Sequence, residues 1–283
     1  MTFRERTYEA FRSGREFRVD VGGARLSVFF VVASRDSKSL KGKISELEGF
    51  GYPFVVVCGE KVNDPRVVHR APRGKFDAIN YGLKFVPPEV DFVALNDVDT
   101  QIHNFGSALS LMHKENADLV YARVDVRSGP QLSFYSFLDK VRKRVPVAAS
   151  GELMLIKHGV LNKILPLKGC KAEDSYILFR VLEEGGSVAF SQDCFVTTKR
   201  TSLGREEEAY KRRTVGGIYQ ALSMSRPPAL VRLFYLLLPF LSPLLLVSGR
   251  NGYHWTKGIL LGFVDYVRGD RAVSWKPSYG QDN

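Results

Sequence analysis

The chain has 283 residues, of which 45% are hydrophobic, 12% aromatic and 25% charged. This composition is typical of a globular protein with a substantial core and excludes a disordered tail or a collagen-like fibre. Lys and Arg outnumber Asp and Glu by 41 to 30, and the formal charge of +11 favours polyanionic partners such as nucleic acid, acidic lipid or phosphorylated small molecules. The cysteines Cys58, Cys170 and Cys194 are scattered, which argues against a disulfide framework or a cysteine-based zinc site and favours a reducing, cytosolic setting.

The first twenty residues mix charged side chains with single aromatic residues and contain no apolar run as long as the core of a signal peptide. We therefore expect the main domain of the chain to stay in the cytoplasm. Changes in composition predict three regions: an N-terminal extension over residues 1–24, an α/β domain over residues 25–225 and an apolar helical region over residues 226–283.

Short apolar runs alternate with amphipathic stretches from Arg25 to about Val196, which predicts alternating strands and helices. The predicted strands cover Leu26–Ser34, Pro53–Cys58, Asp91–Leu95, Ala117–Val126 and Ser187–Phe190, and helical spacing appears around residues 40–47, 76–86, 176–182 and 205–222. Ligands of an open α/β sheet bind beyond the carboxyl ends of its strands, so the residues that follow the strands are candidate site residues. No glycine-rich dinucleotide or P-loop motif follows the first strand, which disfavours both chemistries.

Two aspartates, Asp97 and Asp99, follow the third predicted strand, two positions apart. A strand end can direct both carboxylates into one cleft, where a divalent cation would relieve their repulsion. Mg²⁺ and Mn²⁺ suit such a pair because they bind carboxylate and phosphate oxygens. The alternative is a solvent-exposed turn with two capping aspartates. His103, four residues further along, is either an additional metal ligand or a residue at the start of a helix.

The segment Ala229–Val247 is apolar apart from one charge, Arg232, and as a helix it would reach about 28 Å, nearly the thickness of a bilayer core. Pro239 and Pro243 interrupt it, and basic residues flank it on both sides. A segment that bends back or lies in the membrane interface therefore fits at least as well as a simple span. The alternative is a pair of buried core helices.

A longer pattern surrounds the aspartate pair. Residues 74–83 read GKFDAINYGL ahead of Asp97, Gly151 precedes an apolar strand, and the acidic pair Glu173 and Asp174 opens a helix that finishes near a glycine. Over roughly Leu26 to Leu222 this order resembles the GT-A glycosyltransferases of family 2. The resemblance implies the GT-A fold of nucleotide-diphospho-sugar transferases, an α/β fold with a mostly parallel central sheet flanked by helices, followed here by the C-terminal apolar helical segment.

The resemblance also implies a reaction, the inverting transfer of a sugar from a nucleotide-diphospho-sugar to an acceptor hydroxyl, with Mn²⁺ or Mg²⁺ as cofactor. In that reaction Asp174 is the expected general base, and Asp97 and Asp99 are the expected metal ligands. The residues expected at the donor are Ser34, Arg35, Glu60, Lys75, Asn80 and Asp97, and those expected at the acceptor or the diphosphate are Gly151, Glu173 and Arg213.

Two segments depart from the family pattern. The second strand of family members usually ends in an aspartate that contacts the base, whereas Glu60 is the nearest carboxylate here and Asp64 is a second candidate. The Gln-x-x-Arg-Trp motif of processive and membrane-bound relatives is replaced by Tyr210–Thr214, which keeps only Arg213. We therefore do not expect polysaccharide extension.

Each site residue also has a structural interpretation. Lys75 and Arg213 could be solvated helix residues, and Glu173 and Asp174 could be acids placed favourably at a helix N-terminus. For the whole chain, the rivals are a catalytically silent relative that binds nucleotide-sugars or scaffolds a membrane complex, and a nucleic-acid-binding protein. The basic run over residues 66–75 lacks interleaved aromatics, and no nucleic-acid-binding signature appears. The expected partners are therefore a nucleotide-sugar donor, a lipid-linked or glycan acceptor and the cytoplasmic face of the cell membrane, but no nucleic acid.

Overall fold

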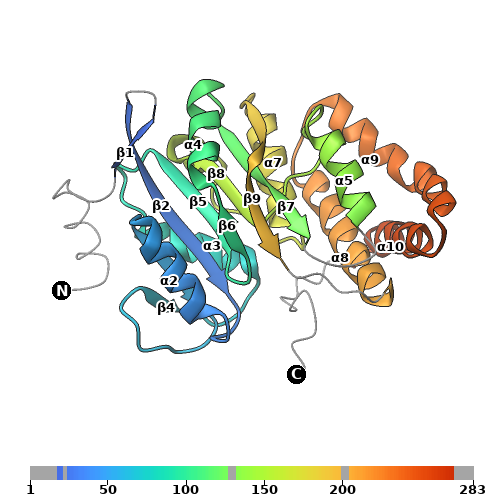
Figure 1. The fold of residues 1–283 in the computed structure, drawn as a ribbon. Coiled ribbons are helices and arrows are strands. Elements are labelled where there is room, and N and C mark those ends of the chain that lie inside the picture. The colour runs from blue at the N-terminus through green and yellow to red at the C-terminus, as the bar shows by residue number, and fades with distance from the viewer. Residues whose placement is uncertain (1–17, 22–23, 127–131, 199–203, 271–283) are drawn as a thin grey trace.

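The computed structural model describes residues 18–21, 24–126, 132–198 and 204–270. Helices cover both faces of one twisted sheet, and four helices gather beyond one end of it (Figure 1). The strands are β1 (Arg18–Val21), β2 (Ala24–Ser34), β3 (Phe54–Cys58), β4 (Val67–His69), β5 (Phe92–Asp97), β6 (Gln101–His103), β7 (Leu119–Val126), β8 (Leu153–Lys157) and β9 (Val188–Thr198). The helices are α2 (Leu40–Phe50), α3 (Lys75–Gly82), α4 (Phe105–Lys114), α5 (Leu132–Arg142), α6 (His158–Ile164), α7 (Glu173–Glu183), α8 (Gly204–Ser223), α9 (Ala229–Leu241) and α10 (Gly249–Val267), with 3₁₀ turns η1 (Leu83–Phe85) and η2 (Ser242–Ser248).

The strand order across the sheet is β4-β3-β2-β5-β8-β7-β9-β6, with β1 paired antiparallel to the start of β2. The half formed by β4, β3, β2 and β5 is parallel, whereas β8 runs antiparallel to both β5 and β7. The sheet is therefore mixed, but β7 and β9 pair parallel in its second half, so the expected mostly parallel sheet is found, with β1, β6 and β8 as its antiparallel strands. A buried strand reads as the same apolar run in either direction, so the sequence pattern does not reveal the reversal at β8.

Strand β2 shows how one apolar run serves both faces of the sheet. Phe29 and Val31 belong to the core on the α3 and α7 side, and Phe30 and Val32 belong to the core on the α2 and α4 side. All four side chains are buried, because helices cover both faces. This double burial places the carboxyl ends of β2, β3 and β5 at one rigid edge of the sheet.

Strand β9 extends well past its predicted end at Phe190. Its pairing with β7 shifts register between Ala122 and Arg123, where β9 bulges after Ser191, and it then continues to Thr198. The polar residues in the bulge interrupt the apolar pattern, which explains why the sequence predicts only the first part of the strand.

The C-terminal segment folds back on itself. Helix α9 is followed by η2, which contains Pro243, and Thr256 of α10 donates its hydroxyl to the Ser242 carbonyl at 2.8 Å. A Cβ on Gly252 would lie 1.7 Å from the Leu245 oxygen, so α10 packs directly on the η2 backbone. By length and composition alone, Ala229–Val267 is the one helical stretch in the described ranges apolar enough to cross a membrane, with a mean hydropathy of 2.1 over an 18-residue window.

Helix α10 also packs closely on α8. A Cβ on Gly258 would lie 2.7 Å from the Cβ of Lys211, and a Cβ on Gly262 would lie 2.6 Å from the Arg212 oxygen. The α10 residue Ile259 is buried in the core on the α7 side. The domain boundary at residue 225 stays a prediction, and helices on its two sides share a packed interface.

Candidate active site

The loops after β2 and β3 lie against each other at the carboxyl edge of the sheet. The Gly59 amide donates to the Ser34 carbonyl at 3.0 Å, and a Cβ on Gly59 would lie only 2.2 Å from the Arg35 oxygen. The exposed Glu60 carboxylate accepts hydrogen bonds from the Ser37 amide at 3.0 Å and the Ser37 hydroxyl at 2.6 Å, and these bonds lower its pKa. The structure therefore brings Ser34, Arg35 and Glu60 into one loop pair, and their binding role stays a prediction.

The Asp97-x-Asp99 pair forms the turn that ends β5. Asp97 is the last residue of the strand and is partly buried, whereas Asp99 is exposed. The Thr100 hydroxyl donates to the Asp97 carbonyl at 2.9 Å, and the Asn96 amide donates to the Thr100 hydroxyl at 3.0 Å. These bonds fix the turn so that the two carboxylates leave the end of the strand two residues apart.

A buried lysine, Lys43, supports the same turn through hydrogen bonds. Lys43 of α2 donates to the Thr100 carbonyl at 2.6 Å and to the Glu46 carboxylate at 2.6 Å. The other Glu46 oxygen accepts the Ile102 amide at 2.5 Å. Burial lowers the pKa of Lys43, although Glu46, Asp97 and Asp99 act in the opposite direction. Lys43 and Glu46 thus clamp the residues that follow Asp99.

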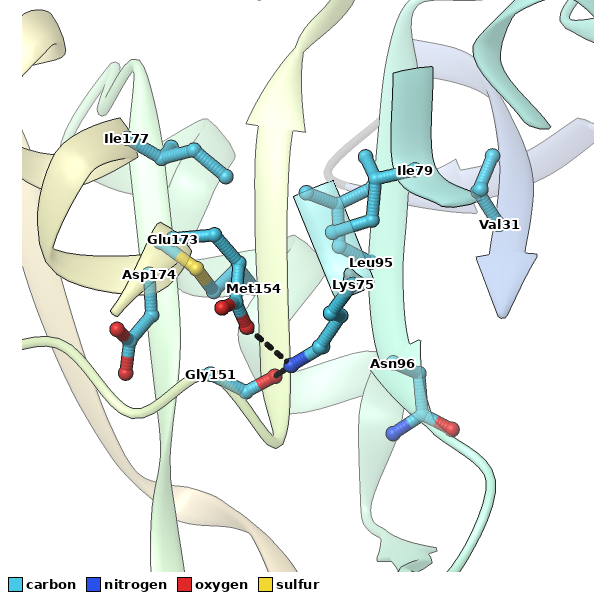
Figure 2. Close-up of a pocket in the computed structure, with 10 residues that line it drawn as sticks. All are labelled: Val31, Lys75, Ile79, Leu95, Asn96, Gly151, Met154, Glu173, Asp174 and Ile177. Atoms are coloured by element: carbon cyan, nitrogen blue, oxygen red, sulfur yellow. Dashed lines mark hydrogen bonds and ion pairs between the residues drawn. The ribbon is translucent and has the colours of Figure 1, made fainter. Parts of the chain in front are cut away.

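Lys75 lies at the centre of the site, and Figure 2 shows its contacts with Glu173 and Gly151. Its ammonium lies 2.7 Å from Asp97 Oδ1, 2.7 Å from Glu173 Oε1 and 3.3 Å from the Gly151 carbonyl. Burial on its own would lower the pKa of Lys75, but the two carboxylates raise it well above its usual value. The ammonium thus makes three contacts inside the protein, which give Lys75 a connecting role; its expected contact with the donor stays a prediction.

Three more residues of the GKFDAINYGL segment have structural roles. The Asn80 side chain donates to the Leu167 carbonyl and accepts from the Leu167 amide, both at 2.9 Å, so it holds the loop before α7. The expected contact of Asn80 with the donor stays a prediction. Gly74 precedes α3 with φ of 119°, and a Cβ on Gly82 would lie 2.6 Å from Val31, so both positions require glycine.

The acidic pair opens α7 and lines the cavity; Figure 2 shows the Glu173 carboxylate directed at Lys75 and the Asp174 carboxylate beside Gly151. Burial raises the pKa of Asp174 to about 6, and the neighbouring Glu173 adds to this shift. One Asp174 oxygen accepts the Ser175 amide at 2.7 Å, so the helix-start interpretation also holds for this residue. A Cβ on Gly151 would lie 3.1 Å from Asp174 Oδ2, which means that the Gly151 loop covers one side of the carboxylate.

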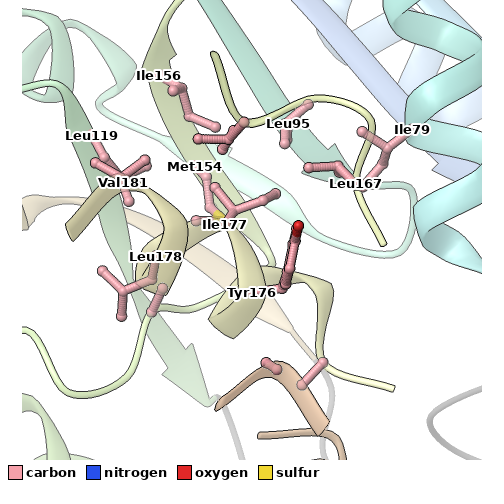
Figure 3. Packing of buried hydrophobic residues seen from close by; sticks show 14 of the residues in the cluster. Ile79, Leu95, Leu119, Met154, Ile156, Leu167, Tyr176, Ile177, Leu178 and Val181 are labelled. Atoms are coloured by element: carbon pink, nitrogen blue, oxygen red, sulfur yellow. The ribbon is translucent and has the colours of Figure 1, made fainter. Parts of the chain in front are cut away.

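Helix α7 holds this pair rigidly. Its residues Ile177, Leu178 and Val181 are fully buried and face the strand residues Met154 and Leu119 (Figure 3). The apolar face of the helix is thus fixed on the sheet, while its first turn stays at the carboxyl edge. This packing positions Glu173 and Asp174 opposite the end of β5.

Arg213 lies on α8, one helical turn before Gly217. A Cβ on Gly217 would lie 2.6 Å from the Ala172 amide nitrogen, so this part of α8 packs against the segment that leads into Glu173. The Arg213 guanidinium lies 5.5 Å from the centre of the Tyr210 ring. The structure therefore places Arg213 on the stretch of α8 that borders the start of α7.

The chain was compared with known proteins. No protein-family model and no curated protein sequence matches it. Among solved structures it is similar to the mannosyltransferase PcManGT from Pyrobaculum calidifontis, in complex with GDP-Man and Mn²⁺, with a TM-score of 0.67 and 15% identity over 95% of this chain and 94% of that chain. It is also similar to GalNAc-T7 with UDP, GalNAc and Mn²⁺, with a TM-score of 0.52 and 11% identity over 87% of this chain and 56% of that chain. The fold is GT-A.

The carboxylates of this GT-A domain suit a divalent cation. Burial raises the pKa of Asp97 to about 7; Lys75 opposes this shift, whereas Asp99 and Glu152 add to it. Within the described residues no cluster of three or more His, Cys, Asp or Glu side chains could hold a metal alone. Mg²⁺ and Mn²⁺ commonly bind one or two carboxylates and complete their coordination with water and substrate phosphates, so Asp97 and Asp99 fit such an ion. His103 stacks on Phe195 and lies 3.1 Å from the Thr197 hydroxyl, which argues against a metal contact.

The buried centre of the site is nearly closed. The cavity beside Lys75, Gly151, Glu173 and Asp174 has a volume of about 10 Å³, which is room for about one water molecule. A ligand larger than water does not fit inside this layer, whereas Asp99 and Arg35 are exposed outside it.

Sequence reasoning missed three residues of the GT-A site. Lys43 lies on the apolar face of its helix and Glu46 lies one turn further on, but neither belongs to a motif, and Glu152 follows a glycine with no motif of its own. The contact of Lys43 with Thr100 joins residues 57 positions apart, so no local pattern signals it. A lysine at an apolar position of α2, between Leu40 and Ile44, was the only available hint.

Proposed function

We propose that this protein is a metal-dependent, inverting glycosyltransferase that moves a sugar from a nucleotide-diphospho-sugar to an acceptor hydroxyl. One observation carries the proposal: a single lysine, Lys75, joins the Asp97-x-Asp99 turn to the acidic start of α7, where the pKa of Asp174 is raised to about 6. A metal-binding pair and a carboxylate suited to take up a proton near neutral pH thus lie in one GT-A site. The similarity to structures that contain Mn²⁺ and sugar nucleotides supports the same reaction.

In this mechanism Asp174 accepts the proton of the acceptor hydroxyl. The hydroxyl oxygen attacks the anomeric carbon, the bond between that carbon and the diphosphate oxygen breaks, and the electron pair leaves with the nucleotide. A divalent cation held by Asp97 and Asp99 would supply Lewis-acid stabilisation of that leaving group. The planar guanidinium of Arg213 is proposed to pair with the diphosphate oxygens, and the loop pair of Ser34, Arg35 and Glu60 is proposed to bind the nucleoside.

We further propose that the enzyme works at the cytoplasmic face of a membrane on a lipid-linked or membrane-proximal acceptor. Helix α9 has 13 residues, or about 20 Å, which is shorter than a bilayer core of about 30 Å. Yet α9 and η2 expose an apolar face, defined by Leu230, Leu233, Leu236, Leu237, Phe240, Leu241, Leu244, Leu246 and Val247. An apolar face of this extent with basic residues beside it favours interfacial binding to anionic lipid.

Thermal denaturation tests the proposal by measuring donor binding. The protein is unfolded in the presence of a panel of UDP- and GDP-sugars, with and without Mn²⁺. A ligand that binds only the folded protein stabilises it by about 2.7 kcal/mol at 100 times its Kd. We expect a shift for at least one sugar nucleotide with Mn²⁺ and its loss in EDTA. Asp99→Asn should lose the metal-dependent part of the shift, because a neutral amide offers one weaker oxygen and no charge.

The control for that measurement is Asp193→Asn, which removes an exposed carboxylate outside the site. Equal metal-dependent shifts in wild-type protein and Asp99→Asn would contradict the metal assignment. Sugar-nucleotide binding without any transfer or hydrolysis would instead favour the catalytically silent relative.

A further inference from the structure

A second cavity lies between the first turns of α8 and α10, and no residue of the active site lines it. Its volume is about 450 Å³, within the roughly 300–1,000 Å³ that small-molecule sites occupy. Its lining consists of six polar or aromatic residues: Arg205, Glu208, Arg250, Tyr253, His254 and Lys257. We call it the basic pocket.

The basic pocket has an excess of positive charge. Glu208 is the single carboxylate of its lining, and it lies 2.8 Å from the Lys257 ammonium and 3.2 Å from His254 Nδ1. Arg205 and Arg250 are exposed, and the described residues give neither of them an ion-pair partner. One carboxylate therefore faces three permanently charged cations, and the two arginines remain available for an anion.

The walls of the basic pocket are fixed by close packing. A Cβ on Gly204 would lie 2.3 Å from the His254 ring, so the imidazole packs directly on the first turn of α8. The first turn of α10 is fixed in the same way by the contact of Gly252 with the Leu245 carbonyl. A pocket whose walls are already in place loses little entropy when it binds a ligand.

The surroundings of the basic pocket indicate which anion it takes. Val247, only three residues before Arg250, is 91% exposed, and Tyr253, which lines the pocket, is half exposed. The apolar face therefore reaches the rim of the pocket. A free phosphate gains nothing from such a rim, whereas a lipid can place its phosphate among the arginines and its acyl chains on Leu244 and Val247.

We propose that the basic pocket binds the phosphate headgroup of an anionic membrane lipid, with Arg205 and Arg250 as the groups that hold the phosphate oxygens. Arginine suits this role because its planar fork can donate two parallel hydrogen bonds to a phosphate. The proposal rests on the membrane association put forward above. It adds a headgroup site to that association, about 12 Å along α8 from Arg213.

The first experiment measures binding of the full chain to phosphatidylcholine vesicles with and without phosphatidic acid, by co-sedimentation. Each basic residue at an anionic surface contributes about 1 kcal/mol, so the double variant Arg205→Gln, Arg250→Gln should bind phosphatidic acid vesicles at least tenfold more weakly. Arg268→Gln is the matched control, because Arg268 is an exposed arginine at the other end of α10, about 27 Å away. Glu208→Gln should bind several-fold more tightly, because it removes the opposing charge.

Arg268→Gln is compared with the single variant Arg250→Gln. If the two weaken vesicle binding equally, the proposed pocket is wrong and binding depends only on general surface charge. Failure of the wild-type protein to bind any vesicle would overturn the membrane association itself. The second experiment separates these outcomes by calorimetry in solution, with dihexanoyl phosphatidic acid below its micelle concentration and with inorganic phosphate. Preferential binding of the short-chain lipid, lost in the double variant, supports the headgroup site even without vesicle binding, and equal affinity for both ligands would overturn the lipid assignment.

Discussion

Lys75 is the residue on which the geometry of the candidate site depends most. Its ammonium holds Asp97 at the end of β5 and Glu173 at the start of α7, although these two residues are 76 positions apart. Without this cation the two carboxylates would face each other across a cavity with room for about one water molecule. Removing one partner of a buried ion pair usually costs more stability than the pair contributes, because a buried charge is left uncompensated.

Asp174 gives the site a defined dependence on pH. Its pKa of about 6 lies above the ordinary 3.8, and a general base works only when ionised, so the rate of transfer should rise through about pH 6 and then level off. Asp174→Asn should lower kcat by a factor of about 10² to 10⁴ and abolish this rise, with donor affinity nearly unchanged. The measurement is a kcat profile from pH 5 to pH 8.

The same shift predicts the effect of Asp174 on stability. Folding favours the neutral carboxyl, so ionisation destabilises the folded protein; this effect is absent below about pH 4 and complete above about pH 6. Asp174→Asn should therefore unfold at a higher temperature than wild type at pH 8, and the difference should vanish toward pH 4. An unchanged kcat, or a variant that is less stable at pH 8, would assign Asp174 to a structural role.

Motif and position together predicted the charged part of the site but not the roles of all its residues. Asp97, Asp99, Lys75 and Asp174 follow strand ends or open helices, and strand ends of a parallel half-sheet meet at one edge. Asn80 lies in the same motif, yet its partner Leu167 is 87 residues away, and an amide that binds backbone looks the same in sequence as one that binds a ligand. Such roles depend on tertiary contacts that spacing does not encode.

Helix α2 illustrates how an element outside the active site can control it. The helix packs on the sheet through Leu40, Ile44 and Leu47, and the same face carries Lys43, which contacts the turn that follows Asp99. The predicted strands and helices were recovered because their apolar periods reflect burial on one or both faces. The direction of β8 and the bulge in β9 depend on pairing with distant strands, so no local pattern could predict them.

Lys43→Met tests the contribution of α2. The substitution keeps the apolar stem but leaves the Thr100 carbonyl without its donor and Glu46 without its cation, so we expect a loss of about 3 kcal/mol or more in the free energy of unfolding. We also expect Mn²⁺ affinity, measured with a bound sugar nucleotide, to fall at least tenfold because the Asp97-x-Asp99 turn loosens. Lys41→Met, an exposed position on the same helix, is the control. A loss of stability with unchanged Mn²⁺ affinity would limit Lys43 to a structural role.

For the whole molecule, the C-terminal region has two different surfaces. Its inner surface packs on α8 and contributes Tyr235, Trp255 and Ile259 to the core, while its outer surface is the apolar face. Removing everything after residue 225 would expose the α8 side of this interface as well as remove the apolar face. A truncated chain would therefore report on folding as much as on membrane attachment.

Substitution of the apolar face alone avoids that problem. Leu236, Phe240 and Leu244 are 64%, 74% and 67% exposed, so changing all three to serine removes little core packing. At about 1 kcal/mol or more for each side chain withdrawn from the membrane, vesicle binding should fall about 100-fold, with the melting temperature and donor binding nearly unchanged. Val267→Ser, an equally exposed residue at the end of α10, is the control. Retention of the triple variant on vesicles would refute docking through this face.

The two glycines through which α10 approaches α8, Gly258 and Gly262, have a consequence for the choice of acceptor. They pack on the Lys211 Cβ and on the backbone of Arg212 and Gly216, so α10 is held rigidly against α8, the helix that carries Arg213 and part of the proposed headgroup pocket. Between Arg205 and Gly217, α8 rises about 18 Å. If lipid binds at one end of the packed helices α8 and α10, the distance of Asp174 from the bilayer is set by the rigid fold. A flexible tether would leave that distance variable. Acceptors would then be sorted by how far their hydroxyl projects from the membrane as well as by their chemistry.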